Sequence, residues 1–145
     1  MIAGEWIMGD VWGPARVESI GKWKYYISLT DDAKRYVTML FLRTKDQAQS
    51  RIKEHVNMIE NKYSQLTKYL WFNNGKKLVN EELRRWPAGK GIIIKTTAPY
   101  SPSQNGVAER FNHTLLELAH AMLFEKNLPI FLWDKAVAHA AYLRN

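Results

Sequence analysis

The sequence predicts an α/β fold in which helices cover both faces of a five-stranded mixed sheet, with three antiparallel and two parallel strands. Three strand-like segments follow one another before the first helical stretch, as in an antiparallel meander. Strands and helices then alternate, as parallel strands require, because each crossover between them needs a helix. At 145 residues and 46% hydrophobic, the chain can bury a core of its own, so one domain is expected over residues 1–145.

The first three strands are expected over residues 5–12, 22–30 and 35–42. The first is an apolar run that ends at the turn signal Gly13-Pro14. In the second, side chains alternate between two sides, which indicates a half-buried strand. One side holds Trp23, Tyr25, Ile27 and Leu29, and the other holds Lys24, Tyr26, Ser28 and Thr30.

The remaining elements alternate between helix and strand. Ile52, Val56 and Ile59 recur at steps of four and three residues, which predicts a helix over residues 45–63. The elements expected after it are a strand over 66–72, a short helix over 79–86, a strand over 91–96, a helix from about 103 to 126, and a last helix from 128 to the chain end.

The composition narrows the classes of partner. A net charge of +7 suits a polyanion such as nucleic acid, although a solvated basic surface explains the charge equally well. The chain has no cysteine, which excludes disulfides and thiolate metal sites. No run approaches the roughly 18 apolar residues of a membrane span, and no signal-peptide pattern opens the sequence, so no membrane partner is expected.

Three motifs stand where predicted elements end or begin. Gly9-Asp10-Val11-Trp12-Gly13-Pro14 closes the first strand, and Phe72-Asn73-Asn74-Gly75 closes the fourth. A loop rich in Pro, Ser and Gly, residues 97–106, leads into the helix that carries Glu109. Thirty-five residues separate Asn73 from Glu109. This ordered set resembles the catalytic core of retroviral and retrotransposon integrases, most closely that of copia-type polyproteins, from about Asp10 to Asn145.

The resemblance implies a ribonuclease-H-like fold and an Asp-Asp-Glu site for Mg²⁺ or Mn²⁺, here Asp10, Asn73 and Glu109. It implies DNA as the partner, both element ends and target DNA, with 3′-end processing followed by strand transfer. It further implies a homo-oligomer, a nuclear location for a functional protein, and a chain that is a fragment of a longer polyprotein.

Asn73 stands where the family has its middle acid. An amide oxygen can ligate a metal but brings no charge to offset two divalent ions, so we expect impaired catalysis. Asp31 and Asp32 are expected at the far end of the second strand, beyond reach, with Arg35 as a structural partner. Glu109 should lie about 160° from the centre of its helix's core-facing stripe, at about 100° per residue. That stripe is expected to consist of Val107, Phe111, Leu115, Leu118 and Met122.

Residues near the predicted site are candidates for contact with DNA. The resemblance implies that the loop before Glu109 lies beside the reactive phosphate, and charged neighbours can reach the backbone. The candidates are Lys95, Ser103, Gln104, Asn105, Arg110 and His113. Trp71 and Phe72 alternate along the fourth strand, so one of them should point toward the metal site or its floor, where it would overpack the interior.

Two other functions remain open from the sequence. A non-catalytic DNA-binding or multimerisation module could retain the same fold, and a divalent metal titration would distinguish it from an integrase core. A ribonuclease H is a weaker alternative, because the additional acids and histidine typical of that enzyme are not apparent.

Overall fold

The structure, a computed structural model, describes residues 2–72, 89–96 and 106–145. Of residues 106–109, 111 and 112 it describes the backbone only. The predicted short helix over 79–86, Asn73, and the loop residues Ser103, Gln104 and Asn105 lie outside the described residues.

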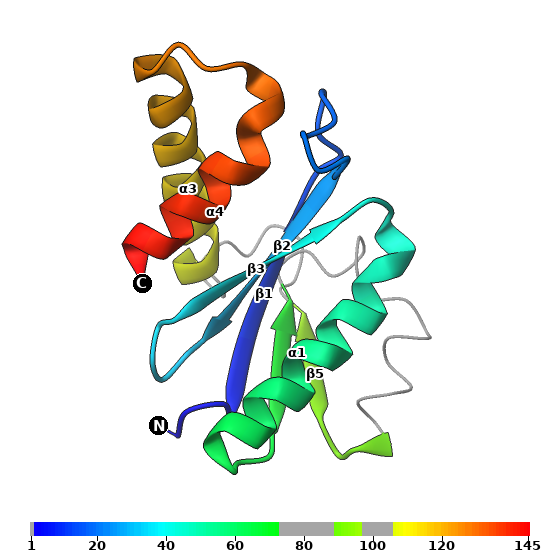
Figure 1. Cartoon of the computed structure of the whole chain (residues 1–145). Helices are drawn as coiled ribbons and strands as arrows, with labels where there is room; N and C mark the ends of the chain where they lie inside the picture. The colour runs from blue at the N-terminus through cyan, green and yellow to red at the C-terminus, as the bar shows by residue number, and fades with distance from the viewer. Residues whose placement is uncertain (1, 73–88, 97–105) are drawn as a thin grey trace.

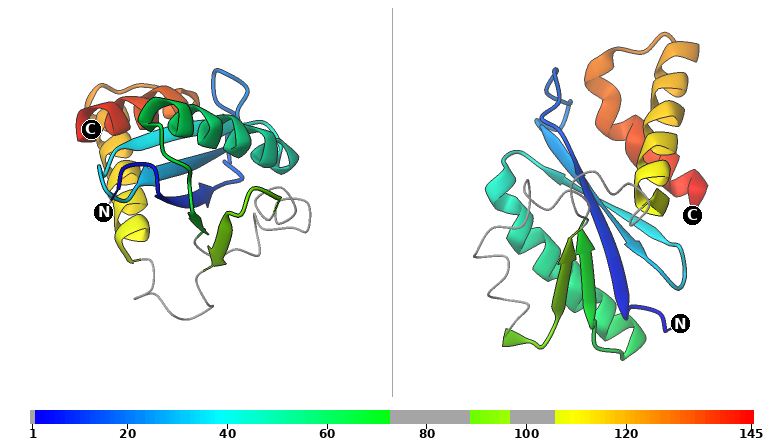
Figure 2. Two further views of the ribbon diagram at one scale, coloured as in Figure 1. Left: turned by 90° about the horizontal axis from the view of Figure 1, so that it is seen from below. Right: turned by 180° about the vertical axis from the view of Figure 1, so that it is seen from behind.

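The predicted mixed sheet is confirmed (Figure 1). Its five strands are β1 (Trp6–Trp12), β2 (Tyr25–Asp31), β3 (Val37–Leu42), β4 (Tyr69–Phe72) and β5 (Ile93–Thr96). They lie in the order β3-β2-β1-β4-β5, with β1 antiparallel to β2 and β2 to β3. The pairs β1–β4 and β4–β5 are parallel. In the rear view of Figure 2, β1 therefore runs through the middle of the sheet.

The helices follow the predicted order with adjusted ends. A 3-10 turn, η1 (Lys45–Gln47), precedes α1 (Ala48–Tyr63). The long helix α3 is described from Gly106 to Glu125. The last helix begins with a separate 3-10 turn, η3 (Ile130–Leu132), and continues as α4 (Trp133–Arg144). None of the helices that the structure describes is long and apolar enough to cross a membrane.

One face of the sheet packs against α1 (Figure 1). Ile52, Val56 and Ile59, the residues that predicted this helix, are all buried. They pack with strand residues such as Leu29 and Leu70 into one apolar cluster. The spacing of four and three residues thus marks the face of α1 that meets the sheet.

The opposite face of the sheet packs against α3 and α4, and this corrects the prediction for the second strand. Tyr26, Ser28 and Thr30 were expected on an exposed side, yet they are 0%, 3% and 6% exposed. Tyr26 belongs to a cluster with Ala119, Leu123, Trp133 and Val137 from the two helices. β2 is therefore buried on both faces, because it is an interior strand between two helical layers.

The buried stripe of α3 also differs from the expected one. Leu115, Ala119 and Leu123 are buried, whereas Leu118 is 40% exposed. Ala119 packs in one buried cluster with Trp133, Ala136 and Val137 of α4. The angle predicted for Glu109 was measured from a stripe that included Leu118. Because Leu118 is not buried, that angle no longer describes where Glu109 lies relative to the buried side of α3.

The turn between β2 and β3 is structural, as predicted. The Asp31 carboxylate accepts hydrogen bonds from the amides of Gly4 and Ala33, each 3.2 Å long. Asp32 pairs with Arg35 at 3.5 Å. At the start of β3, the Asn145 side chain accepts a hydrogen bond from the Val37 amide and donates one to its carbonyl, both 2.8 Å long.

Candidate active site

Asp10 lies in the last half of β1, on the face of the sheet that packs against α3 and α4. Side chains alternate along a strand. Ile7 and Val11 belong to the α1 cluster, so Asp10 and Trp12 point to the other side. Asp10 is partly exposed and lies two residues before the last residue of the central strand.

The parallel pairing of β1 and β4 brings the second motif to Asp10. Gly9 is paired with Phe72, the last residue of β4. The next pair in that register would join Asp10 to residue 73, which itself lies outside the described residues. The expectation that the first and fourth strands are neighbours is therefore confirmed, while the position of the Asn73 side chain stays a prediction.

Tyr26 is a neighbour of Asp10 that the sequence analysis did not single out. The two residues lie on the same face of adjacent strands, with Asp10 opposite Ser28 and Tyr26 opposite Trp12. Burial, with a smaller contribution from the negative charge of Asp10, raises the pKa of the Tyr26 phenol far above its usual value. The phenol therefore stays protonated. The sequence pattern that could have indicated Tyr26 is the series of polar side chains at every second position of β2, the strand that pairs with β1.

Phe72 does not occupy the site. It is fully buried in the α1 cluster, on the opposite face from Asp10. A Cβ at Gly9 would stand only 2.7 Å from its ring, so the ring fills the space that Gly9 leaves open. Phe72 thus points away from Asp10, and its expected overpacking of the interior stays a prediction. Trp71 shares the face of Asp10, and its buried Nε1 has no hydrogen-bond partner among the described residues.

Lys95, a candidate for DNA contact, lies on β5 above an aromatic cluster. Its ammonium is 5.1 Å from the ring centre of Trp6 and 5.2 Å from that of Tyr69. These two rings stack at 4.0 Å, and Trp71 lies 6.2 Å from Trp6. The sheet face beside Asp10 thus carries a cation held over aromatic rings. Its members come from three strands, so no local sequence pattern reveals it.

Two further candidates lie on the exposed side of α3. Arg110 is exposed, and His113 pairs with Glu117 at 2.9 Å, both side chains being largely exposed. A surface pair of this kind contributes little to stability and leaves His113 able to exchange partners. Within the described part of the chain, no three His, Asp or Glu side chains gather into a metal site. The candidate ligands Asn73 and Glu109 are not among the side chains compared.

The comparisons with known proteins agree with this geometry. No family model matches the chain. It is 35% identical over 139 residues to the retrovirus-related Pol polyprotein from transposon TNT 1-94 of Nicotiana tabacum, a match that covers 96% of the chain and 10% of that relative. It is 29% identical to the Pol polyprotein from transposon RE2 of Arabidopsis thaliana, covering 97% of the chain and 10% of that relative.

Solved structures share the fold. A chain of the simian T-cell lymphotropic virus intasome, solved with PP2A regulatory subunit B56γ, superimposes with a TM-score of 0.71 at 19% identity, covering 97% of this chain and 48% of that one. The HTLV-2 integrase catalytic core, solved with magnesium in a trimeric form, gives 0.63 at 17% identity, covering 98% and 85%. The chain is therefore homologous to a segment, about a tenth in length, of the Pol polyproteins of copia-type transposons, and it has the ribonuclease-H-like fold of the retroviral integrase catalytic core.

Proposed function

We propose that the chain is an integrase-type core that processes DNA 3′ ends and joins them to target DNA, with an activity reduced by Asn73. The observation that carries this proposal is the parallel register of β1 and β4, which ends at the pair of Gly9 and Phe72. These two residues directly precede Asp10 and Asn73 in the sequence. Two ligands contributed by adjacent strand ends are what a shared metal site requires. The similarity to transposon Pol polyproteins supports the same function.

Asp10, Asn73 and Glu109 fit a hard divalent cation, because all three offer oxygen ligands. When bound, Mg²⁺ or Mn²⁺ would activate the attacking oxygen and stabilise the departing one. Asp10 would be one of the residues that hold the ion, since it is partly exposed on the central strand. Tyr26 and Ser28, both buried on β2, would limit the orientations open to its carboxylate.

Asn73 accounts for the expected loss of activity. A carboxylate in its place would attract each nearby unit charge by about 4 kcal/mol at 4 Å and an effective dielectric of 20. Each 1.4 kcal/mol lost from transition-state stabilisation slows a reaction about tenfold. Losing this charge should therefore cost several orders of magnitude in rate, even if the amide oxygen still coordinates one ion.

DNA would bind along the face that holds Lys95, Arg110 and His113, with Ser103, Gln104 and Asn105 nearest the reactive phosphate. The net charge of +7 supports a mode dominated by phosphate contacts. Such binding weakens as salt rises and discriminates little between sequences. The neighbours solved as a trimer and within an intasome support self-association, and a DNA target would place the functional protein in the nucleus.

A metal titration with matched variants tests the proposal. Asn73→Asp should tighten Mn²⁺ binding by calorimetry at least about tenfold and add metal-dependent nicking of labelled duplex DNA, because it restores one charge between the ions. Asn61→Asp makes the same chemical change on an exposed position of α1 and should alter neither. If Asp10→Asn in the Asn73→Asp background leaves Mn²⁺ affinity unchanged, the proposed site is wrong.

Asn73, which stands in place of the family's middle acid, also favours a second candidate function. This candidate is a DNA-binding or multimerisation module without catalysis. Such a module would bind duplex DNA in a salt-dependent manner but would bind Mn²⁺ no more tightly after Asn73→Asp. The same titration therefore separates the two functions.

A further inference from the structure

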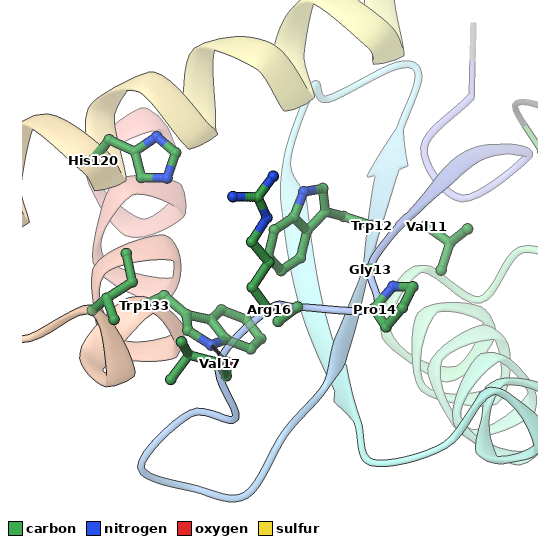
Figure 3. A pocket seen from close by; sticks show the side chains of 10 residues that line it. Val11, Trp12, Gly13, Pro14, Arg16, Val17, His120 and Trp133 are labelled. Carbon is green, nitrogen blue, oxygen red and sulfur yellow. Dashed lines mark hydrogen bonds between the residues drawn. The ribbon is translucent and has the colours of Figure 1, made fainter.

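A pocket of about 750 Å³ opens along the segment that directly follows Asp10 in the chain (Figure 3). Its wall begins at Val11 and continues through the segment 12–17 that follows β1. His120 of α3, Ile130 of η3 and Trp133 of α4 complete it. The pocket is thus lined by four elements of the chain, and its volume is in the range of small-ligand sites.

The wall of the pocket is held in place by hydrogen bonds between distant segments. The Trp133 indole N–H donates to the Val17 carbonyl at 2.8 Å. The Ile20 amide donates to the Phe131 carbonyl, also at 2.8 Å. These bonds fix the segment after β1 against η3 and α4, so the pocket is formed before any ligand arrives.

The lining combines aromatic rings with positive charge. Trp12 stacks on Tyr26 with ring centres 5.3 Å apart, and Trp133 meets Trp12 edge-on at 5.2 Å. Figure 3 shows the side chains of Arg16 and His120 in the space between the segment after β1 and α3. None of the ten lining residues is an Asp or Glu, and no ion pair of Arg16 occurs among the described residues. The pocket therefore suits a planar ring that carries an anion.

We propose that this pocket holds one unpaired nucleotide of a DNA strand that passes Asp10, with its base beside Trp12 and its phosphate on Arg16. The base would extend the Tyr26–Trp12 stack by one ring, and base–aromatic stacking accepts any base. A guanidinium matches a phosphate with paired hydrogen bonds. This inference rests on the proposed function, because the adjacency to Asp10 in the chain is what makes DNA the expected ligand.

The nucleotide must be unpaired for a geometric reason. A pocket lined by separate parts of the chain admits a base only after the base has left its stack and its partner. Unpaired nucleotides at a DNA end have already lost that partner, so they enter at the lowest cost. Exposed apolar side chains at the mouth, Val17 at 40% and Ile130 at 52%, exclude water from the bound ring.

Binding of two DNA probes by the full chain tests the inference. One is a blunt 20-base-pair duplex, and the other carries a two-nucleotide single-stranded extension with 2-aminopurine in it. In anisotropy measurements, the wild type should bind the extended probe about tenfold more tightly than the blunt duplex. This factor corresponds to the lower part of the free-energy range for stacking one base on an aromatic side chain. Binding should also quench the fluorescence of 2-aminopurine. Both 5′ and 3′ extensions are compared, and a preference for either one supports the inference.

Variants at the pocket should remove this preference alone. Arg16→Gln and Val17→Asp should reduce it to less than about twofold and restore the fluorescence, while blunt-duplex affinity changes by less than about twofold. Arg51→Gln removes the same charge from α1, on the other side of the sheet, and should keep the preference. Circular dichroism melting verifies that each variant is folded.

Three results would overturn the inference. Equal affinity for both probes, without quenching, removes the nucleotide site but leaves the proposed DNA-binding function standing. A preference that survives in both Arg16→Gln and Val17→Asp places the unpaired nucleotide elsewhere. Absence of binding to either probe defeats the proposed function as well, and an apolar protein segment then becomes the better occupant of the pocket.

Discussion

Replacing Gly9 by Ala tests the packing that connects the two strand ends of the candidate site. Gly9 precedes Asp10 on β1 and is paired with Phe72, which precedes Asn73 on β4. A methyl group at residue 9 would meet Phe72 ring carbons at 2.7 and 2.8 Å and a Leu29 methyl carbon at 3.0 Å. Favourable carbon contacts lie at about 3.5–4.0 Å, so the added carbon must displace the ring or the strand.

The expected cost follows from the burial of the ring. Phe72 is 0% exposed and packs in the α1 cluster, so it has no solvent into which it can withdraw. Overpacking of this kind costs about 1–3 kcal/mol. Alanine has fewer conformations than glycine in the unfolded chain, and this difference stabilises the folded state by about 0.4–1 kcal/mol. We therefore expect Gly9→Ala to lower the free energy of unfolding by about 1–2 kcal/mol in urea denaturation.

A double-mutant cycle assigns that cost to the ring. In a Phe72→Leu background, which shortens the side chain, Gly9→Ala should cost less by at least about 1 kcal/mol, because residues in contact couple. Gly89→Ala is the matched control, since its Cβ would meet no atom of the described residues within 4 Å. It should change stability by less than about 0.5 kcal/mol. An equal cost of Gly9→Ala in both backgrounds would refute the argument.

Two other residues give predictions of stability. Burial lowers the pKa of His55 to about 4, whereas an unfolded histidine titrates near 6.5. Between these values only the unfolded chain takes up the proton, so stability is lost as pH falls, by about 2 kcal/mol from pH 7 to 5. His55→Leu should lose this pH dependence in urea titrations at the two pH values, and an unchanged difference would contradict the assignment. Asn145→Ala removes both hydrogen bonds to Val37 and should cost about 1–2 kcal/mol. Faster hydrogen exchange of the Val37 amide would localise that loss to the start of β3, and unchanged exchange would argue against it.

The order of the strands and helices along the chain, and the location of Asp10 on the first strand, were predictable because local sequence patterns mark them. A period of two, a spacing of four and three residues, and turn residues after each strand mark the elements one at a time. The pairing of β1 with β4 then followed from the fold that the motifs imply, and the observed register agrees.

The features that escaped prediction depend on contacts between distant segments. β2 looks half-polar in sequence, yet Ser28 and Thr30 are buried because α3 and α4 cover them from much later in the chain. In α3, Leu118 carries the stronger hydrophobic signal, but Ala119 is the buried residue because it faces the side chains of α4. The pocket along the segment after Asp10 likewise combines Arg16, His120 and Trp133, which no single motif joins.

The side-chain amide of Asn145 has a consequence for how copies of this domain can associate. β3 and β5 are the two edges of the sheet, and an unpaired edge can recruit a strand from another molecule. At the start of β3, the amide of Asn145 occupies the same N–H and C=O that such a strand would need. The other edge, β5, is only four residues long and carries Lys95, which discourages growth in that direction. Pairing of β3 with a strand of another copy would therefore first have to displace the Asn145 side chain from Val37.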